Sequence, residues 1–232
     1  MLLAIDTSTS AIGAALHDGT RVLSSVVHED PRRHAELLAP AIEQALTHAG
    51  VSRETLTRVV CGVGPGPFTG LRVGVVTALV LAHSLGLPPP RGVCSLDALA
   101  HALVGRHTGP VLVASDARRK EVYWAVYDVG PHGAHRLDGP GVARAADLRE
   151  EVRSLPVVGR GAELYADSLP HRLPDAPRDV DPAVLAGLAQ ALLSGEHPDA
   201  AVGGGLGLLD PEPLYLRRPD AVAGVPTTAA AR

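Results

Sequence analysis

Two acidic residues, Asp6 and Asp116, each stand at the end of an apolar run that is typical of a buried strand. The three residues after Asp6 are all hydroxylated: Thr7, Ser8 and Thr9. Hydroxyl and backbone N–H groups in such a turn can surround a phosphate, and a carboxylate beside them can hold a metal ion through water. We predict that the two acids and the hydroxyl turn face each other across a cleft as a vestigial phosphate or nucleotide site. In the alternative, both acids only cap their own turns.

A glycine- and proline-rich segment occupies residues 62–74. No Gly-Lys-Ser or Gly-Lys-Thr follows these glycines, and Pro65 and Pro67 lack the N–H donors that a phosphate cradle needs. The segment is therefore not a P-loop. We predict a loop that leads into a helix over residues 69–85.

The predicted helix carries a small residue at every fourth position from Gly70 to Ala82. Residues four apart lie on one face of a helix, and a stripe of small residues lets a second helix approach closely. We predict that this face binds a partner chain. The residues assigned to the interface are Phe68, Gly70, Leu71, Gly74, Val75, Ala78 and Ala82. In the alternative, the stripe packs on the protein's own sheet.

Metal and hydrolytic chemistry is not indicated by the sequence. The chain has 11 histidines, but none has the H-x3-H or H-E-x-x-H spacing that places two imidazoles on one helix face. A G-x-S-x-G nucleophile elbow is also missing. We expect no metal, no cofactor and no catalytic residue.

A basic cluster, Arg118-Arg119-Lys120, follows Asp116 almost directly. Lys120 is the one lysine in a chain that otherwise uses arginine. We interpret the cluster as a solvated hairpin turn, in preference to a contact for phosphate, RNA or an acidic partner surface.

The composition bounds the class of protein. Of the 232 residues, 46% are hydrophobic and 20% are charged, which excludes a collagen, a coiled coil and a wholly disordered chain. The net charge of −4 and the aromatic content of 3% predict no general affinity for polyanions or single-stranded nucleic acid. The longest apolar run, within residues 73–82, is too short to cross a bilayer. We expect a soluble, cytoplasmic protein without membrane contact.

The elements that must position these residues occur in the same order twice, as β-β-β-α-β-α. In the first half they are residues 2–5, 11–17, 20–27, 37–46, 59–63 and 69–85. In the second half they are residues 111–115, 121–128, 134–139, 144–154, 157–158 and 183–193. We predict an α/β fold of two related lobes, residues 1–108 and 109–218, followed by a flexible tail over 219–232.

Four segments, in order along nearly the whole chain, resemble the TsaB family. They are residues 3–9, 62–74, 116–123 and 213–220. The G-P-G-x-F-T-G-[LV]-R motif is the most specific of them, and here Pro67 stands where serine is commoner. The resemblance implies an actin-like, ribonuclease-H-like fold. It also implies a role in making threonylcarbamoyladenosine at position 37 of tRNAs that read A-starting codons.

In that family, the TsaB subunit is not catalytic. The resemblance implies that it pairs with a catalytic subunit, TsaD, that an ATPase, TsaE, joins them, and that contact with tRNA is indirect. The helix after Phe68 resembles the pairing helix of the family, so we expect the chain alone to form a homodimer through it. Two alternatives stay open: an independent ATP-binding or ATP-hydrolysing actin-like enzyme, with residues 203–205 as its glycine loop, and a peptidase.

Overall fold

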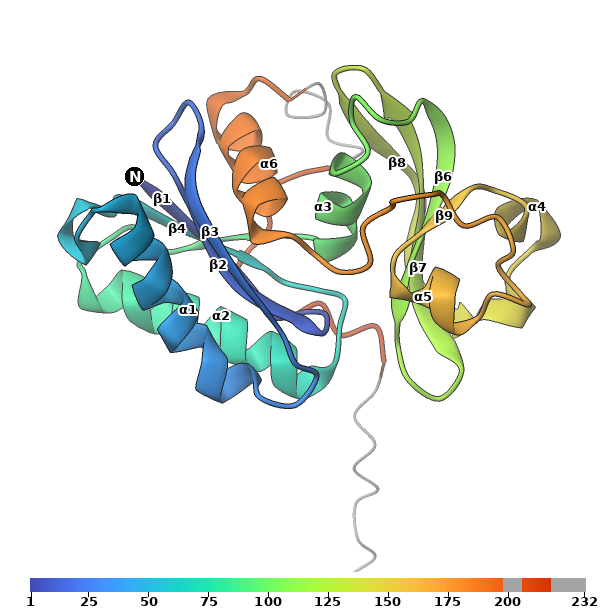
Figure 1. The fold of residues 1–232 in the computed structure, drawn as a ribbon, viewed down its shortest axis with the longest axis horizontal. Helices are drawn as coiled ribbons and strands as arrows, with labels where there is room; N and C mark the ends of the chain where they lie inside the picture. The colour runs from blue at the N-terminus through green and yellow to red at the C-terminus, as the bar shows by residue number, and fades with distance from the viewer. Residues whose placement is uncertain (198–205, 218–232) are drawn as a thin grey trace, which may run out of the picture.

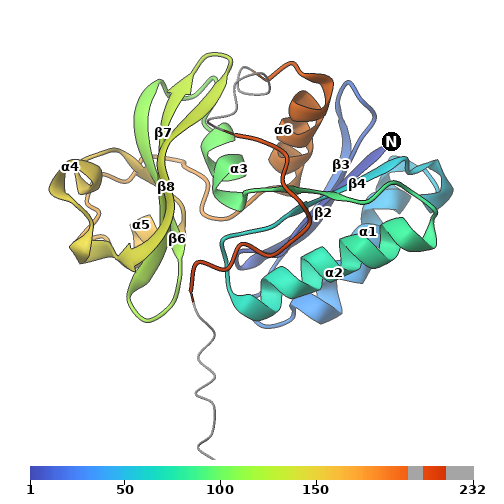
Figure 2. The same cartoon turned by 180° about the vertical axis from the view of Figure 1, so that it is seen from behind.

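The computed structural model describes residues 1–197 and 206–217, and its elements form alternating layers of helix and sheet (Figures 1 and 2). Both the glycine loop at 203–205 and the tail over 219–232 lie outside the described residues. Within the described ranges, no helix is long and apolar enough to span a membrane.

The two sheets share one order of strands. The first sheet runs β3 (Val22–Glu29), β2 (Ala11–His17), β1 (Leu2–Asp6), β4 (Arg58–Gly62) and β5 (Arg91–Val93). The second runs β8 (Gly133–Arg144), β7 (Glu121–Gly130), β6 (Gly109–Asp116) and β9 (Val157–Val158). In each sheet an antiparallel meander is extended by a parallel strand beside its first strand. The predicted two-lobed α/β fold is confirmed, and the repeat of the predicted duplication holds for the order of the strands.

Helices cover both faces of each sheet. The outer face of the first sheet carries α1 (His34–Ala49) and α2 (Phe68–Ser84). Between the sheets lie α3 (Ser95–His101) and α6 (Pro182–Ser194), and the far side of the second sheet carries α4 (Glu150–Arg153) and α5 (Arg160–Leu164) (Figure 1). Single 3₁₀ turns lie at Arg53–Thr55 and Ala145–Asp147.

The strands at the centre of the sheets are buried on both faces. Leu3 and Ile5 of β1 pack toward α1 and α2, whereas Leu2 and Ala4 join the core between the sheets. The residues of β6 divide in the same way between the central core and the outer core. Successive side chains of a strand point to opposite faces, so both strands need the continuous apolar runs from which they were predicted.

The placement of the late helices differs from the sequence prediction. The helix predicted over 144–154 forms only α4 and the short 3₁₀ turn before it, and α5 was not predicted. The helix predicted over 183–193 exists as α6, but it packs on β1, β2 and β3 of the first sheet. The chain after it also stays with the first lobe, since Leu209 pairs with Gly92. The predicted lobe of 109–218 therefore loses its last part, because the apolar inner face of the first sheet requires a cover.

The small-residue stripe of α2 is a core surface and not an exposed one. Gly70, Gly74, Ala78 and Ala82 are buried within the chain, as are Leu71 and Val75. A Cβ atom at Gly70 would lie 2.5 Å from the carbonyl oxygen of Thr7, and one at Gly74 would lie 2.4 Å from Thr7 Oγ1. The stripe lets α2 approach the end of β1, so its assignment to a partner interface is wrong. Of the assigned residues, only Phe68 is exposed, at 41%.

We expect Gly74→Arg to unfold the first lobe partly or wholly. The new side chain must displace Thr7 or bury an unpaired charge, which costs about 3 kcal/mol or more. For a chain of this size, each kcal/mol lowers the melting temperature by about 2–4 °C, so thermal melts should show a loss of about 10 °C. His83→Arg, at an exposed position of the same helix, is the matched control and should melt as the wild type does. Equal melting temperatures for all three proteins would contradict this packing.

Candidate functional site

Asp6 ends β1 beneath the hydroxyl turn, and its carboxylate is buried, with 1% exposure. One carboxylate oxygen accepts hydrogen bonds from the Ser8 backbone N–H and the Ser8 hydroxyl, both at 2.8 Å. The other accepts from the Ser95 hydroxyl, at 2.9 Å. The acid therefore holds its own turn and the start of α3, as in the capping alternative.

Burial raises the pKa of Asp6 from its ordinary value of 3.8 to about 6, against the opposing effect of the hydrogen bonds from Ser8 and Ser95. The neighbouring strand seals the carboxylate: a Cβ atom at Gly62 would lie 1.7 Å from Asp6 Oδ2. Gly62 is thus the residue that lets β4 pass over the acid. In this structure the Asp6 side chain lies under the floor of the cleft and not on its surface.

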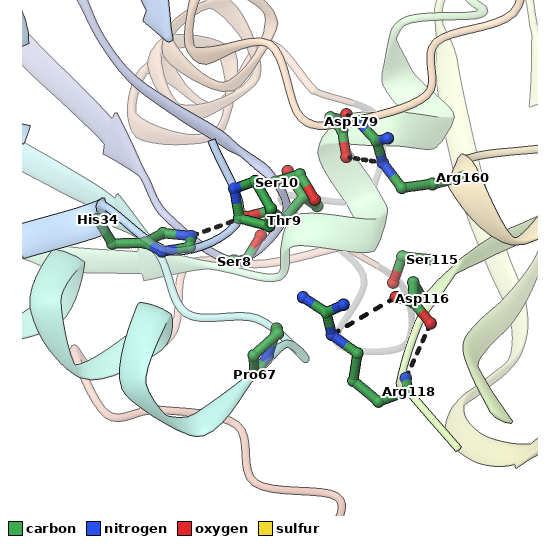
Figure 3. Close-up of a pocket in the computed structure, with 11 residues that line it drawn as sticks. Ser8, Thr9, Ser10, His34, Pro67, Ser115, Asp116, Arg118, Arg160 and Asp179 are labelled. Carbon is green, nitrogen blue, oxygen red and sulfur yellow. Dashed lines mark hydrogen bonds and ion pairs between the residues drawn. The ribbon is translucent and has the colours of Figure 1, made fainter. Parts of the chain in front are cut away.

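The residues of the hydroxyl turn have two different roles: Thr7 packs inside the lobe, and Ser8 and Thr9 line the cleft. The buried Thr7 hydroxyl donates to the carbonyl of Gly70 at 2.7 Å, which ties the turn to α2. His34 Nε2 lies 3.0 Å from the carbonyl oxygen of Thr9. Ser8, Thr9 and the next residue, Ser10, line the cleft between the lobes (Figure 3).

Asp116 reaches the same cleft from the second lobe (Figure 3). Its carboxylate accepts from the Arg118 backbone N–H at 2.8 Å and lies 3.6 Å from the Arg118 guanidinium. The Tyr165 hydroxyl donates to it at 3.4 Å. The structure thus brings Ser8, Thr9 and Asp116 together as predicted, and leaves Asp6 and Thr7 out.

Arg160 is a cleft residue that the sequence analysis missed. It begins α5, forms an ion pair with Asp179, and donates from Nη2 to Glu29 Oε1 at 2.7 Å. Glu29 ends β3, so this ion pair joins the two lobes. No motif surrounds Arg160, and an isolated arginine in a sequence gives no sign of a partner 131 positions away.

The cleft combines the hydroxyl turn with two guanidinium groups, those of Arg118 and Arg160. The open space among these groups is about 20 Å³, roughly the room that one water needs. The two acids that line it, Asp116 and Asp179, each already face an arginine. Among residues 1–197 and 206–217, no three His, Cys, Asp or Glu side chains group as a metal ion requires.

Two sheets with one order of strands, an acid at the end of each first strand and a cleft between the lobes define an actin-like two-lobed protein. A family model described as "TsaD: tRNA N6-adenosine threonylcarbamoyltransferase" matches residues 21–151. A Mycobacterium tuberculosis (strain H37Rv) protein named as uncharacterized is 42% identical over 95% of this chain and 93% of its own length. The Escherichia coli K12 "tRNA threonylcarbamoyladenosine biosynthesis protein TsaB" is 34% identical over 72% of this chain and 74% of that protein.

A crystal structure from Pseudomonas aeruginosa, described as that of an uncharacterized protein with similarity to peptidase YeaZ, has the same fold. Its TM-score is 0.73 and its sequence identity 31%, covering 93% of this chain and 99% of that chain. The chain belongs to the TsaB family.

The burial of Asp6 predicts a pH-dependent stability. Because the folded pKa of about 6 exceeds the ordinary 3.8, ionisation of Asp6 destabilises the fold by about 3 kcal/mol above pH 6 and by nothing below pH 3.8. We expect Asp6→Asn to melt several degrees higher than the wild type at pH 7.5, with the difference vanishing near pH 4. Asp18→Asn is the control of opposite sign, because hydrogen bonds from Thr20 and Arg21 lower the pKa of Asp18. A variant less stable than the wild type at pH 7.5 would contradict this account.

Proposed function

We propose that this chain is a non-catalytic subunit in the synthesis of threonylcarbamoyladenosine in tRNA, and that it pairs with a TsaD-like catalytic subunit through α1 and α2. The observation that carries the proposal is an exposed apolar groove between these two helices. The family membership supplies the pathway, since its named relatives are tRNA threonylcarbamoyladenosine biosynthesis proteins.

The groove is lined mainly by Ile42 and Leu46 of α1 and by Val76, Val80 and Leu81 of α2. Val76 is 53% exposed and Val80 61% exposed. An apolar face of this kind, with Glu43 and Arg53 beside it, resembles the apolar centre and polar rim of a protein interface. This face of α2 replaces the small-residue stripe as the pairing surface.

The same surface suits a second copy of the chain when the partner is missing. Two copies would form a symmetric contact in which each groove receives the α2 of the other chain. Homodimer and heterodimer then exclude one another, so the catalytic subunit would compete with the second copy. A TsaE-like ATPase would join the assembled pair.

The non-catalytic role is supported by the contacts of the two strand-end acids, Asp6 and Asp116, with other residues of the chain. Asp6 is sealed under Gly62 and is engaged by Ser8 and Ser95. Asp116 faces Arg118. Carboxylates so engaged are poorly suited to hold the metal ion of a nucleotide.

Pairing is tested by Val80→Arg in a pull-down with the TsaD-like subunit of the same source. A charge buried without a partner costs several kcal/mol, whereas affinities from micromolar to nanomolar correspond to about 8–12 kcal/mol. We expect retention of the catalytic subunit to fall at least tenfold. Leu137→Arg, at a leucine 62% exposed on β8 of the other lobe, is the matched control and should pair normally. Pairing by Val80→Arg at wild-type strength would exclude this surface.

The pure chain alone should not turn over ATP at ordinary enzyme rates, which are about 1 per second or more. A phosphate-release assay on the chain, with and without the catalytic subunit, measures this. Turnover by the chain alone that is lost in Asp6→Asn would establish the independent ATPase instead.

A further inference from the structure

A second cleft opens where three parts of the chain meet. Gly66, Pro67 and Phe68 line it from the first lobe, and the turn between β6 and β7 lines it from the second. The segment 215–217, which returns along the first lobe (Figure 2), forms the third wall. The cleft lies beside the interlobe site, because Arg118 and Pro67 line both.

The charge of this second cleft is opposite to that of the whole protein. The chain carries a net charge of −4, yet the charged residues that line the cleft are Arg118, Arg119 and Arg217. Arg217 is fixed by a hydrogen bond of 3.1 Å to the carbonyl of Ala117 and by an ion pair with Glu121. The side chain of Arg118 is 58% exposed. Arg217 and Arg118 face Glu121 and Asp116, so the part of this wall that can meet an anion is the exposed turn at 118–120.

The basic turn is held in an unusual backbone conformation. Arg118, Arg119 and Lys120 have φ values of 62°, 53° and 64°. The left-handed region disfavours residues with a Cβ atom, and glycine, asparagine or aspartate normally fills it in a hairpin. The hairpin turn predicted for this cluster exists. Its positive φ values favour glycine, asparagine or aspartate over the arginines and lysine that occupy it. Long cationic side chains kept at strained positions beside a cleft point to binding.

Two aromatic rings stand at the edge of the cleft. Phe68 and Tyr215 stack with their ring centres 5.1 Å apart and are 41% and 40% exposed. The Arg72 guanidinium lies 3.9 Å from the centre of the Phe68 ring, and its Nε donates to the Tyr215 hydroxyl at 3.0 Å. Cationic groups beside fixed aromatic rings are the combination with which proteins bind RNA loops.

We propose that this cleft and its basic turn bind phosphate groups of the tRNA directly. The inference rests on the proposed function, which supplies the RNA, and goes beyond the indirect contact that the family resemblance implies. Phe68 begins α2 and Val76 is the first residue of the groove on the same helix, about 12 Å further along its axis, so the cleft and the pairing surface lie at different parts of one helix. A tRNA held by the catalytic subunit would then cross from that subunit onto the turn.

The test replaces Arg119 and Lys120 together by glycine, which leaves the contact between Arg118 and Asp116 intact. Glycine adopts positive φ without strain, so the double variant should melt at the wild-type temperature or above. We expect its complex with the catalytic subunit to bind unmodified tRNA at least tenfold more weakly. The slope of log K against log salt should fall by about 1.5, since each lost phosphate contact removes about 0.7–0.9.

The matched control removes two other exposed arginines, through Arg21→Gln with Arg106→Gln, and should bind tRNA as the wild type does. Both tRNA binding and pairing are measured, and tRNA binding is also measured on the chain alone at low salt. Normal pairing with unchanged tRNA affinity and salt slope in the glycine variant would overturn this inference and leave the proposed function standing. If the wild-type chain does not pair with the catalytic subunit, but its own tRNA binding falls in the glycine variant, the proposed pairing is overturned and this inference stands. Lost pairing with unchanged tRNA binding would identify the turn as a protein contact and overturn the inference.

Discussion

The desolvation of Asp6 constrains the whole first lobe. Its carboxylate lies where β1, β4 and α3 meet, and burial raises its pKa to about 6. An acid in such a place must receive hydrogen bonds, and Ser8 and Ser95 supply them. These bonds fix the turn after β1, and the turn determines which hydroxyl groups reach the cleft.

The position of α2 follows from the same turn. Thr7 donates to the carbonyl of Gly70, and it fills the space that the missing side chain of Gly74 leaves. Once the small-residue face of α2 is used against β1, the opposite face must carry Val76 and Val80 outward. The tight packing on the inner side of the helix thus sets which side chains of α2 face outward.

The sequence predicted those parts of the molecule that depend on local pattern. Apolar runs ending in Asp6 and Asp116 predicted two equivalent strands, because a strand buried on both faces needs every residue apolar. A residue pattern does not show against which sheet a helix packs. The sequence analysis therefore assigned α6 to the second lobe instead of the first, and the small-residue stripe at Gly74 to a partner chain instead of the end of β1. Arg160 and the left-handed turn at Arg119 had no signal, since a long-range ion pair and a positive φ without glycine leave no trace in residue types.

The charged side chains in the interlobe cleft form ion pairs with one another. These pairs affect where on the molecule a ligand can bind at low cost. Arg160 joins Glu29 of the first lobe and Asp179, which lies shortly before α6, and Arg118 faces Asp116. A ligand entering between the lobes must break ion pairs that are partly buried, which costs more than breaking exposed ones. The apolar groove of α1 and α2 lies away from these ion pairs and already carries Val76 and Val80 on the surface. This physical balance accords with the proposed pairing at the outer face of α1 and α2.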